Sequence, residues 1–375
     1  MPRLEGVIRA ARDSSLAQII ARLYEAVIAF SNGTQQQADL AAVLIKRLSA
    51  RLHVTPEKAT RLGVTKSCRA GLAWCVCFTS LLGWAQDLAP RAYVITPTHS
   101  NAVTLSYSFY SGELLFDGAV PITGARAKVN VSVLSLTHSL KLLGRSANFS
   151  ASLPYGVGNF RGTVVGAETN AYRSGTFDSA FRLSLNLKGG PAMDVQDFRK
   201  WRQKTLVGVS LKVVAPTGQY DPTKLINYGA NRWAFKPEVG LSRRWGHWVV
   251  DTYGAVWFFT PNHNFFSKNQ FSPGTNIQKQ NSTFASEGHL SYDVKPRLWA
   301  SLDGNFWVGG RSSLNGVENP NTEQRNSRIG GTVSFPVSKH QSIKFSYNRG
   351  AYIRYGGNYQ NVSFGWQCSW LGNPN

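Results

Sequence analysis

The sequence predicts an all-β fold, a twelve-stranded antiparallel up-and-down β-barrel that spans an outer membrane. Runs of roughly ten residues alternate between apolar and polar or small side chains, which is the pattern of transmembrane β-strands. The connections between these runs differ in length between the two ends of the predicted barrel. Charged residues make up only 16% of the chain and aromatic residues 12%, which argues against a disordered chain and against an ordinary helix-rich protein. No apolar run is long enough for a transmembrane helix.

Residues 1–63 differ from the rest of the chain, because their apolar residues recur at helical spacing. Two stretches, 16–29 and 38–52, show this period, and a Thr-Pro-Glu sequence at 55–57 is typical of a helix start. The segment is either a genuine helical extension of the barrel or the product of a start codon assigned too early. We favour the second explanation, with translation beginning near Val64, because the segment that follows must stand close to an N-terminus.

Residues 64–85 have the three-part layout of a secretory signal peptide. Lys66 and Arg69 give it a positive start, an apolar run follows, and small residues precede the predicted cleavage after Ala85. The alternative is a buried helix of a soluble domain. Cleavage would leave residues 86–375 as the outer-membrane β-barrel with a single cysteine, which suits a compartment where unpaired thiols are avoided.

The first six predicted strands each carry an apolar face opposite a small or polar face. In the first run Leu105 and Tyr107 alternate with Ser106, and in the second Val129 alternates with Lys128. We expect the apolar faces to contact lipid and the polar faces to line the lumen. These strands are predicted at residues 103–109, 128–133, 148–155, 181–187, 207–213 and 236–241.

The second half of the barrel repeats the pattern with six further strands. Val250 alternates with Asp251, and Leu290 alternates with His289, so charged and polar side chains again face the predicted lumen. The strands are predicted at residues 248–258, 284–292, 298–306, 328–335, 343–348 and 361–367. Aromatic residues near strand ends are expected to form girdles at the membrane interfaces, namely Tyr155, Trp248, Phe258, Phe259, Tyr292, Trp299, Trp307, Trp366 and Trp370. Closure of the sheet would leave no unpaired strand edge in lipid.

The predicted connections fall into a short set and a long set. The short ones are residues 141–145, 243–246, 294–296 and 338–340, and the long ones are 110–126, 156–176, 215–235, 260–281 and 309–326. One connection, 189–203, breaks the alternation, and within it residues 195–203 are predicted to form a short helix. Short turns at one end and long loops at the other are typical of outer-membrane barrels.

Charged residues on the polar strand faces are the candidate lumen and selectivity residues. Acids fall on consecutive strands and bases on the flanking ones, which predicts a transverse field across a narrow bore. The alternative is that these charges pair into buried salt bridges that merely fill the interior. The acids are Glu238, Asp251, Glu287 and Asp303, and the bases are Lys128, Arg182, Lys212, Arg328 and Lys344; the excess of one base predicts a mild anion preference.

The connection at residues 215–236 is the second candidate site. Its prolines and glycines favour turns, and its polar side chains can form hydrogen bonds within the loop. Asp221, Asn231, Arg232 and Trp233 are the residues with which it could constrict the pore. The loop is therefore either a self-packed external loop or a lid over the lumen.

Several other function classes lack support in the sequence. The 41 basic residues outnumber the 20 acidic ones, but they are spread evenly, and we find no motif of a nucleic-acid-binding fold. A GxSxG motif and a recognisable Ser/His cluster are missing, so an enzyme is not expected. The cysteines have neither CxxC nor zinc-site spacing, so no metal or other cofactor is predicted.

From about residue 90 to about residue 370 the chain resembles a known family. The residues that carry the resemblance are 115–117, 144–146, 153–155, 214–222, 225–227, 231–233, 235–238, 309–311, 316–319 and 326–328, of which the APTGQYDP stretch at 215–222 is the most specific. The family is labelled "putative MetA-pathway of phenol degradation", and residues 1–63 lie outside the resemblance. The resemblance implies an outer-membrane barrel that passes hydrophobic or aromatic compounds.

The expected function is therefore passive uptake of small, phenol-like solutes through a channel in the outer membrane of a Gram-negative-type bacterium. Two alternatives stay open, namely a structural or adhesion barrel with a sealed lumen and an outer-membrane hydrolase. The expected partners are outer-membrane lipid, the barrel-assembly machinery and the small-molecule solute, and no nucleic acid. The sequence does not predict the oligomeric state.

Overall fold

The computed structural model describes residues 88–115, 122–164, 167–269 and 272–372. The predictions of a helical extension at 1–63 and of a signal peptide at 64–85 lie outside the described residues. Within the described ranges, no helix has both the length and the apolar character needed to cross a membrane.

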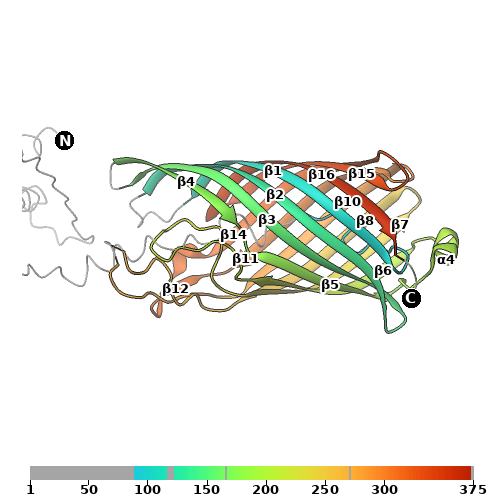
Figure 1. The fold of residues 1–375 in the computed structure, drawn as a ribbon, viewed down its shortest axis with the longest axis horizontal. Coiled ribbons are helices and arrows are strands. Elements are labelled where there is room, and N and C mark those ends of the chain that lie inside the picture. The colour runs from blue at the N-terminus through green and yellow to red at the C-terminus, as the bar shows by residue number, and fades with distance from the viewer. Residues whose placement is uncertain (1–87, 116–121, 165–166, 270–271, 373–375) are drawn as a thin grey trace, which may run out of the picture. The chain divides into compact units, whose positions relative to one another are not determined.

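The described chain forms a closed antiparallel β-barrel (Figure 1). Its strands are β1 (Ser100–Leu115), β2 (Ile122–Leu142), β3 (Arg145–Val164), β4 (Ala167–Thr176), β5 (Ser179–Lys188), β6 (Thr205–Ala215), β7 (Ala234–Trp245), β8 (Trp248–Phe259), β10 (Thr283–Lys295), β11 (Leu298–Gly309), β14 (Gln324–Pro336), β15 (Gln341–Ile353) and β16 (Gly356–Leu371). β1 pairs with both β2 and β16, which closes the sheet. β4 and β5 follow one another along β3, so these thirteen strands fill twelve positions and the predicted barrel is confirmed.

Alternation along the strands separates an apolar outer face from a polar interior. Leu302 and Leu105 are 70% and 50% exposed, whereas Ser291 and Asp251 are almost fully buried. Large leucines in the open on one face are expected only where that face contacts lipid. The hydrogen bonds between neighbouring strands satisfy the backbone N–H and C=O groups, for which lipid offers no partners. These physical constraints explain why the alternation predicted the fold.

The predicted orientation of β2 is wrong. Val129 and Val131 are buried in a cluster with Phe160 inside the barrel, so Lys128 lies on the outer face and is exposed. Farther along the strand Leu134 and Leu136 are the exposed side chains, so the apolar face changes sides within one unbroken strand. Period-2 patterning alone does not say which face is lumenal where both faces carry apolar residues.

Three predicted aromatic girdle residues also belong inside the barrel. Trp299 and Trp307 are 8% and 0% exposed, and Trp307 packs in an interior cluster with Trp257, against which Phe259 also packs. Tyr155 and Trp248, by contrast, are about half exposed on the outer face, as a girdle requires.

The short connections are confirmed as tight turns at one end of the barrel. They join β2 to β3, β7 to β8, β10 to β11 and β14 to β15. The connection between β5 and β6 lies at the same end and contains α4 (Val195–Lys200), with Asp194 as its N-cap (Figure 1). The predicted helix at 195–203 therefore exists but ends three residues earlier. In outer-membrane barrels the end with short turns is periplasmic.

At the opposite end the predicted loop at 156–176 is wrong, because strands fill most of it. β3 continues to Val164 and pairs with β4, with Tyr155 opposite Thr176, so the ladder extends beyond the apolar band. The connections from β8 to β10 and from β11 to β14 carry a small sheet of β9 (Gln278–Gln280), β12 (Ser312–Leu314) and β13 (Val317–Asn319). The 3-10 helix η2 (Pro320–Thr322) follows β13.

Candidate functional site

A cavity of about 380 Å³ lies inside the barrel between two unlike walls. One wall is apolar and aromatic, and it includes Tyr110, Val131, Phe160, Phe177 and Tyr228. The other wall is charged, with Asp178, Arg182, Lys212, Lys236, Glu238 and Glu287. A cavity of this kind could hold a small molecule with a ring on one side and a polar group on the other.

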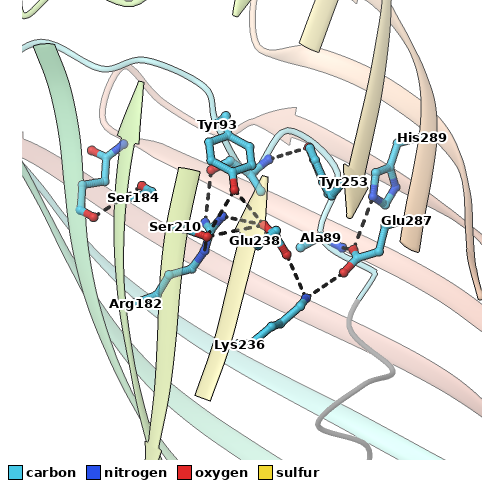
Figure 2. A network of polar contacts seen from close by, with 12 residues as sticks. Ala89, Tyr93, Arg182, Ser184, Ser210, Lys236, Glu238, Tyr253, Glu287 and His289 are labelled. Carbon is cyan, nitrogen blue, oxygen red and sulfur yellow. Dashed lines mark hydrogen bonds and ion pairs between the residues drawn. The ribbon is translucent and has the colours of Figure 1, made fainter. Parts of the chain in front are cut away.

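The charged wall is a connected network that crosses from β5 to β10 (Figure 2). Arg182 on β5 lies 3.0 Å from Glu238 on β7. Lys236 lies 2.9 Å from Glu238 and 3.0 Å from Glu287, and all three side chains are nearly fully buried. Each carboxylate therefore has a cation within ion-pair distance, which offsets the cost of removing it from bulk water.

His289 extends this network toward β11 and β14. Its Nδ1 lies 2.8 Å from Asp303, and its Nε2 lies 3.6 Å from Glu287. Asp303 also accepts hydrogen bonds from Ser301 and Thr332. Ser301 donates to the carboxylate and not to the imidazole, so this group does not have the arrangement of a serine nucleophile and its base.

Residues 88–99 run inside the barrel and were not expected there. The Tyr93 hydroxyl donates to Glu238 at 2.9 Å, and Arg91 pairs with Asp293 at 2.7 Å and stacks over Trp299 at 4.3 Å. The backbone of the segment takes part as well. Ala92 N–H donates to the Tyr253 hydroxyl, and Ala92 C=O accepts from Arg182. Ala89 N–H lies 3.5 Å from Glu287 (Figure 2). The segment thus contacts wall residues from β5 to β11.

The base of this segment is held at the short-turn end. Ile95 packs in an apolar cluster with Met193 and Leu206, against which α4 and Trp201 also pack. Thr98 N–H donates to Met193 C=O, and His99 N–H donates to Ser139 C=O on β2. Followed backwards from β1, the chain therefore enters the lumen beside α4. Its first described residues lie next to the cavity that Ala89 and Ala92 help to line.

The structure brings together only some of the predicted lumen residues. Arg182, Glu238 and Glu287 belong to the network above. Asp251 and Asp303 face the same interior and are only 1% and 6% exposed. Arg328 lies farther round the barrel, where it donates to Asn348 and to Tyr359 C=O. The predicted separation of acids from bases is wrong, because Arg182 reaches across β6 to an acid.

The remaining predicted bases differ in position. Lys212 lines the cavity, with its ammonium group 5.8 Å from the centre of the Trp257 ring. Lys344 points inward near Trp299, 5.7 Å from that ring. Lys128 lies on the outer face, for the reason given above, so the lumen placement predicted for it is wrong.

The loop that joins β6 to β7 packs beside β4. Asp178, between β4 and β5, accepts hydrogen bonds from the N–H groups of Gly218 and Ala230, both at 2.8 Å. Gln219 N–H donates to Thr176 C=O, and Tyr228 donates to Arg173 C=O. In the sheet of described residues β4 pairs only with β3, so these contacts let the loop cover the other edge of β4.

The four predicted constriction residues do not line the cavity described above. Asn231 donates to Asn262, Arg232 donates to Gln280, and Trp233 stacks beside Phe235. The loop residues that do reach the cavity are Ile226, Asn227 and Tyr228. The geometry therefore favours the self-packed loop.

Asp221 stabilises a turn within that loop. It accepts hydrogen bonds from both the N–H and the hydroxyl of Thr223, and it pairs with Lys224 at 2.9 Å. Hydrogen bonds from Thr223 and Lys224 favour its ionised form and lower the pKa of Asp221 to about 2.

Four residues of the site are not among the predicted selectivity residues. Lys236 stands two positions before Glu238, so the same alternation that selected Glu238 could have selected it. The alternation predicts His289 on the lumenal face but does not predict its partners. Arg91 and Tyr93 precede the first strand in a segment with no strand period, and nothing in the local pattern indicates that it folds back into the barrel.

A model of the family described as "Putative MetA-pathway of phenol degradation" matches residues 100–366. Among solved structures, the chain is similar to the COG4313 outer membrane channel from Pseudomonas putida F1, at 17% identity and a TM-score of 0.63, covering 76% of this chain and 100% of that one. A comparison with curated proteins finds no match.

Two further solved structures are more distant. The transport unit of the autotransporter AIDA-I from Escherichia coli has 8% identity and a TM-score of 0.44, covering 81% of this chain and 97% of that one. The CymD monoaromatic hydrocarbon channel has 8% identity and a TM-score of 0.37, covering 74% and 90%. The match to the Pseudomonas structure shows the fold, which is that of an outer-membrane barrel.

Proposed function

This chain belongs to the family described as "Putative MetA-pathway of phenol degradation", and from that membership we propose that it is an outer-membrane channel for passive uptake of small, hydrophobic or aromatic solutes. The observation that carries the proposal is the cavity with one aromatic and one charged wall inside a closed barrel. Its volume falls in the range of about 300–1,000 Å³ that is usual for small-molecule sites. The COG4313 outer membrane channel, to which the fold is similar, is in keeping with this function.

Selectivity would arise from the two walls acting on different parts of one solute. An aromatic ring can pack against Phe160 and Tyr228, while a hydroxyl group can exchange hydrogen bonds with Arg182 or Ser210. Movement through the channel would be diffusion down a concentration gradient. A phenol-like solute would be favoured over a sugar of similar size, because a sugar leaves the aromatic wall without an apolar partner.

Liposome swelling with a panel of phenols, sugars and organic anions tests this function. We expect phenols to enter faster than sugars, and we expect Phe160→Ser to reduce that difference. Phe345→Ser, on the outer face, is the matched control and should leave the order of solutes unchanged. Equal swelling rates for phenols and sugars in the wild type would contradict the proposed solute class.

A structural or adhesion barrel with a closed lumen is the second candidate. The observation in its favour is the combination of the buried ion pairs with the segment 88–99, both of which fill the interior. Conductance across planar bilayers separates the two functions. A channel gives discrete current steps, whereas a closed structural barrel gives none.

The proposal includes processing of the chain before the barrel forms. Ala89 lies inside the lumen, and cleavage after Ala85 would leave three residues before it. Membrane lipid and the barrel-assembly machinery are the partners that this route requires. Mass spectrometry of outer-membrane fractions should find Gln86 at or near the mature N-terminus; peptides from residues 1–63 in that fraction would contradict the early-start explanation.

A further inference from the structure

Residues 88–94, the tip of the lumenal segment, are attached to the barrel in a different way from any strand. The wall is closed without them, since β1 pairs with β16. The tip is held by single contacts from separate strands, among them Tyr93 to Glu238, Ala92 to Tyr253 and Arg91 to Asp293. No ladder of successive backbone hydrogen bonds among the described residues joins this tip to a strand.

The wall groups that hold the tip keep other partners without it. Glu238 retains Arg182 and Lys236, and Glu287 retains Lys236. Asp293 retains Arg244 at 2.6 Å. Withdrawal of the tip would therefore leave Glu238, Glu287 and Asp293 each beside a cation, so the large cost of stranding a charge does not arise at these three groups. Asp251, the buried acid that interacts with Arg91, keeps an electrostatic interaction with His289.

The Tyr93 ring occupies a seat formed by two glycines. A methyl group added at Gly240 would lie 2.1 Å from the ring, and one added at Gly208 would lie 2.3 Å from it. Neither glycine has a positive φ, so the backbone does not require glycine there. Because glycine weakens a strand interior, its presence at both positions is explained by the close approach of the ring.

We propose that the tip, residues 88–94, is a reversible gate of this channel. Seated, it forms part of the cavity wall through Ala89 and Ala92; withdrawn toward the short-turn end, it widens the bore along β6, β7, β8 and β10. Ile95, packed with Met193 and Leu206, holds the base of the segment in place while the tip moves. The inference rests on the proposed channel function, because a gate requires a path that it can close.

Single-channel recording of the purified full-length protein in planar bilayers tests the gate. Gly240→Ala fills the seat of the Tyr93 ring, so we expect the channel to spend several-fold more time at a higher conductance level than the wild type. Gly254→Ala on the next strand is the matched control, because a methyl group there meets no atom within 4 Å. It should behave like the wild type.

Gly240→Ala could fail to fold, and electrophoresis of heated and unheated samples would detect that failure. A second variant therefore tests the gate independently. Tyr93→Ala removes the ring without crowding any strand, and it should raise the time spent at the higher level in the same way. If the wild type conducts and both variants match it, the gate is overturned while the channel function stands. If neither the wild type nor any variant conducts, the proposed function itself fails.

Discussion

Among single residues, Lys236 has the most demanding position, because its ammonium group lies within 3.0 Å of two carboxylates on different strands. Alternation along β7 was enough to predict that Glu238 faces the lumen. It could not predict the pairs, because partners such as Arg182 and Glu238 stand on strands separated by a third, and their meeting depends on register and side-chain length. The face of a residue is thus a local property, whereas its partner is not.

Lys236→Ala should lower the free energy of unfolding by about 3–5 kcal/mol, because it leaves Glu238 and Glu287 without their shared buried cation. Urea titration of the folded barrel in detergent measures this change. The double variant Lys236→Ala, Glu287→Gln should recover part of the loss. Lys128→Ala, on the exposed outer face, is the control and should change stability by no more than about 0.5 kcal/mol.

Asp221 gives a prediction of pH dependence at the same scale. Its pKa in the folded loop is about 2, below the ordinary value of 3.8, so its contribution to loop stability is present above about pH 4 and is lost as the pH falls through 2. A carbon-detected NMR titration of the Asp221 carboxyl group should show a midpoint near 2. A midpoint at the ordinary value would mean that the bonds from Thr223 and Lys224 do not form.

At the scale of elements, the strands were predictable and the chain between them was much less so. Eleven of the twelve predicted runs have the expected face outward, because lipid on one side and a wet interior on the other impose the alternation. The prediction failed for β2, because Val129 and Val131, in its half toward the long-loop end, pack in the interior cluster with Phe160. β4 was missed because its register on β3, and not its composition, makes it a strand.

The loop between β6 and β7 depends on Asp178 for its position against β4. Asp178→Ala removes the acceptor of two backbone N–H groups, each bond to a charged group being worth about 1.5–3 kcal/mol. We expect faster amide exchange at Gly218 and Ala230, measured by mass spectrometry. Asp194→Ala, which removes a similar backbone bond at α4, should leave the exchange of residues 216–230 unchanged.

For the whole molecule, the number of lumenal charges depends on the corrected faces of the strands. Of the predicted selectivity residues Lys128 lies outside, which leaves four bases and four acids in the interior. Lys236 adds a base, but Asp178 also lines the cavity, so three bases and three acids line it and the anion preference stays a prediction. Of these bases, Arg182, Lys212 and Lys236 line the cavity, so they are the ones that a permeating ion would meet.

Replacing Arg182 and Lys212 with Gln should move the reversal potential toward that of cations, because one cavity-lining base then remains beside Asp178, Glu238 and Glu287. The barrel should still fold, because Glu238 keeps Lys236 at 2.9 Å and the Tyr93 hydroxyl. Lys128→Gln removes a charge from the outer face, and it should leave the reversal potential where it was. Bilayer recordings under a salt gradient, with a thermal melt of each variant, measure both effects. An unchanged reversal potential in a conducting double variant, or an equal shift in Lys128→Gln, would place the ion path elsewhere than the cavity between the two walls.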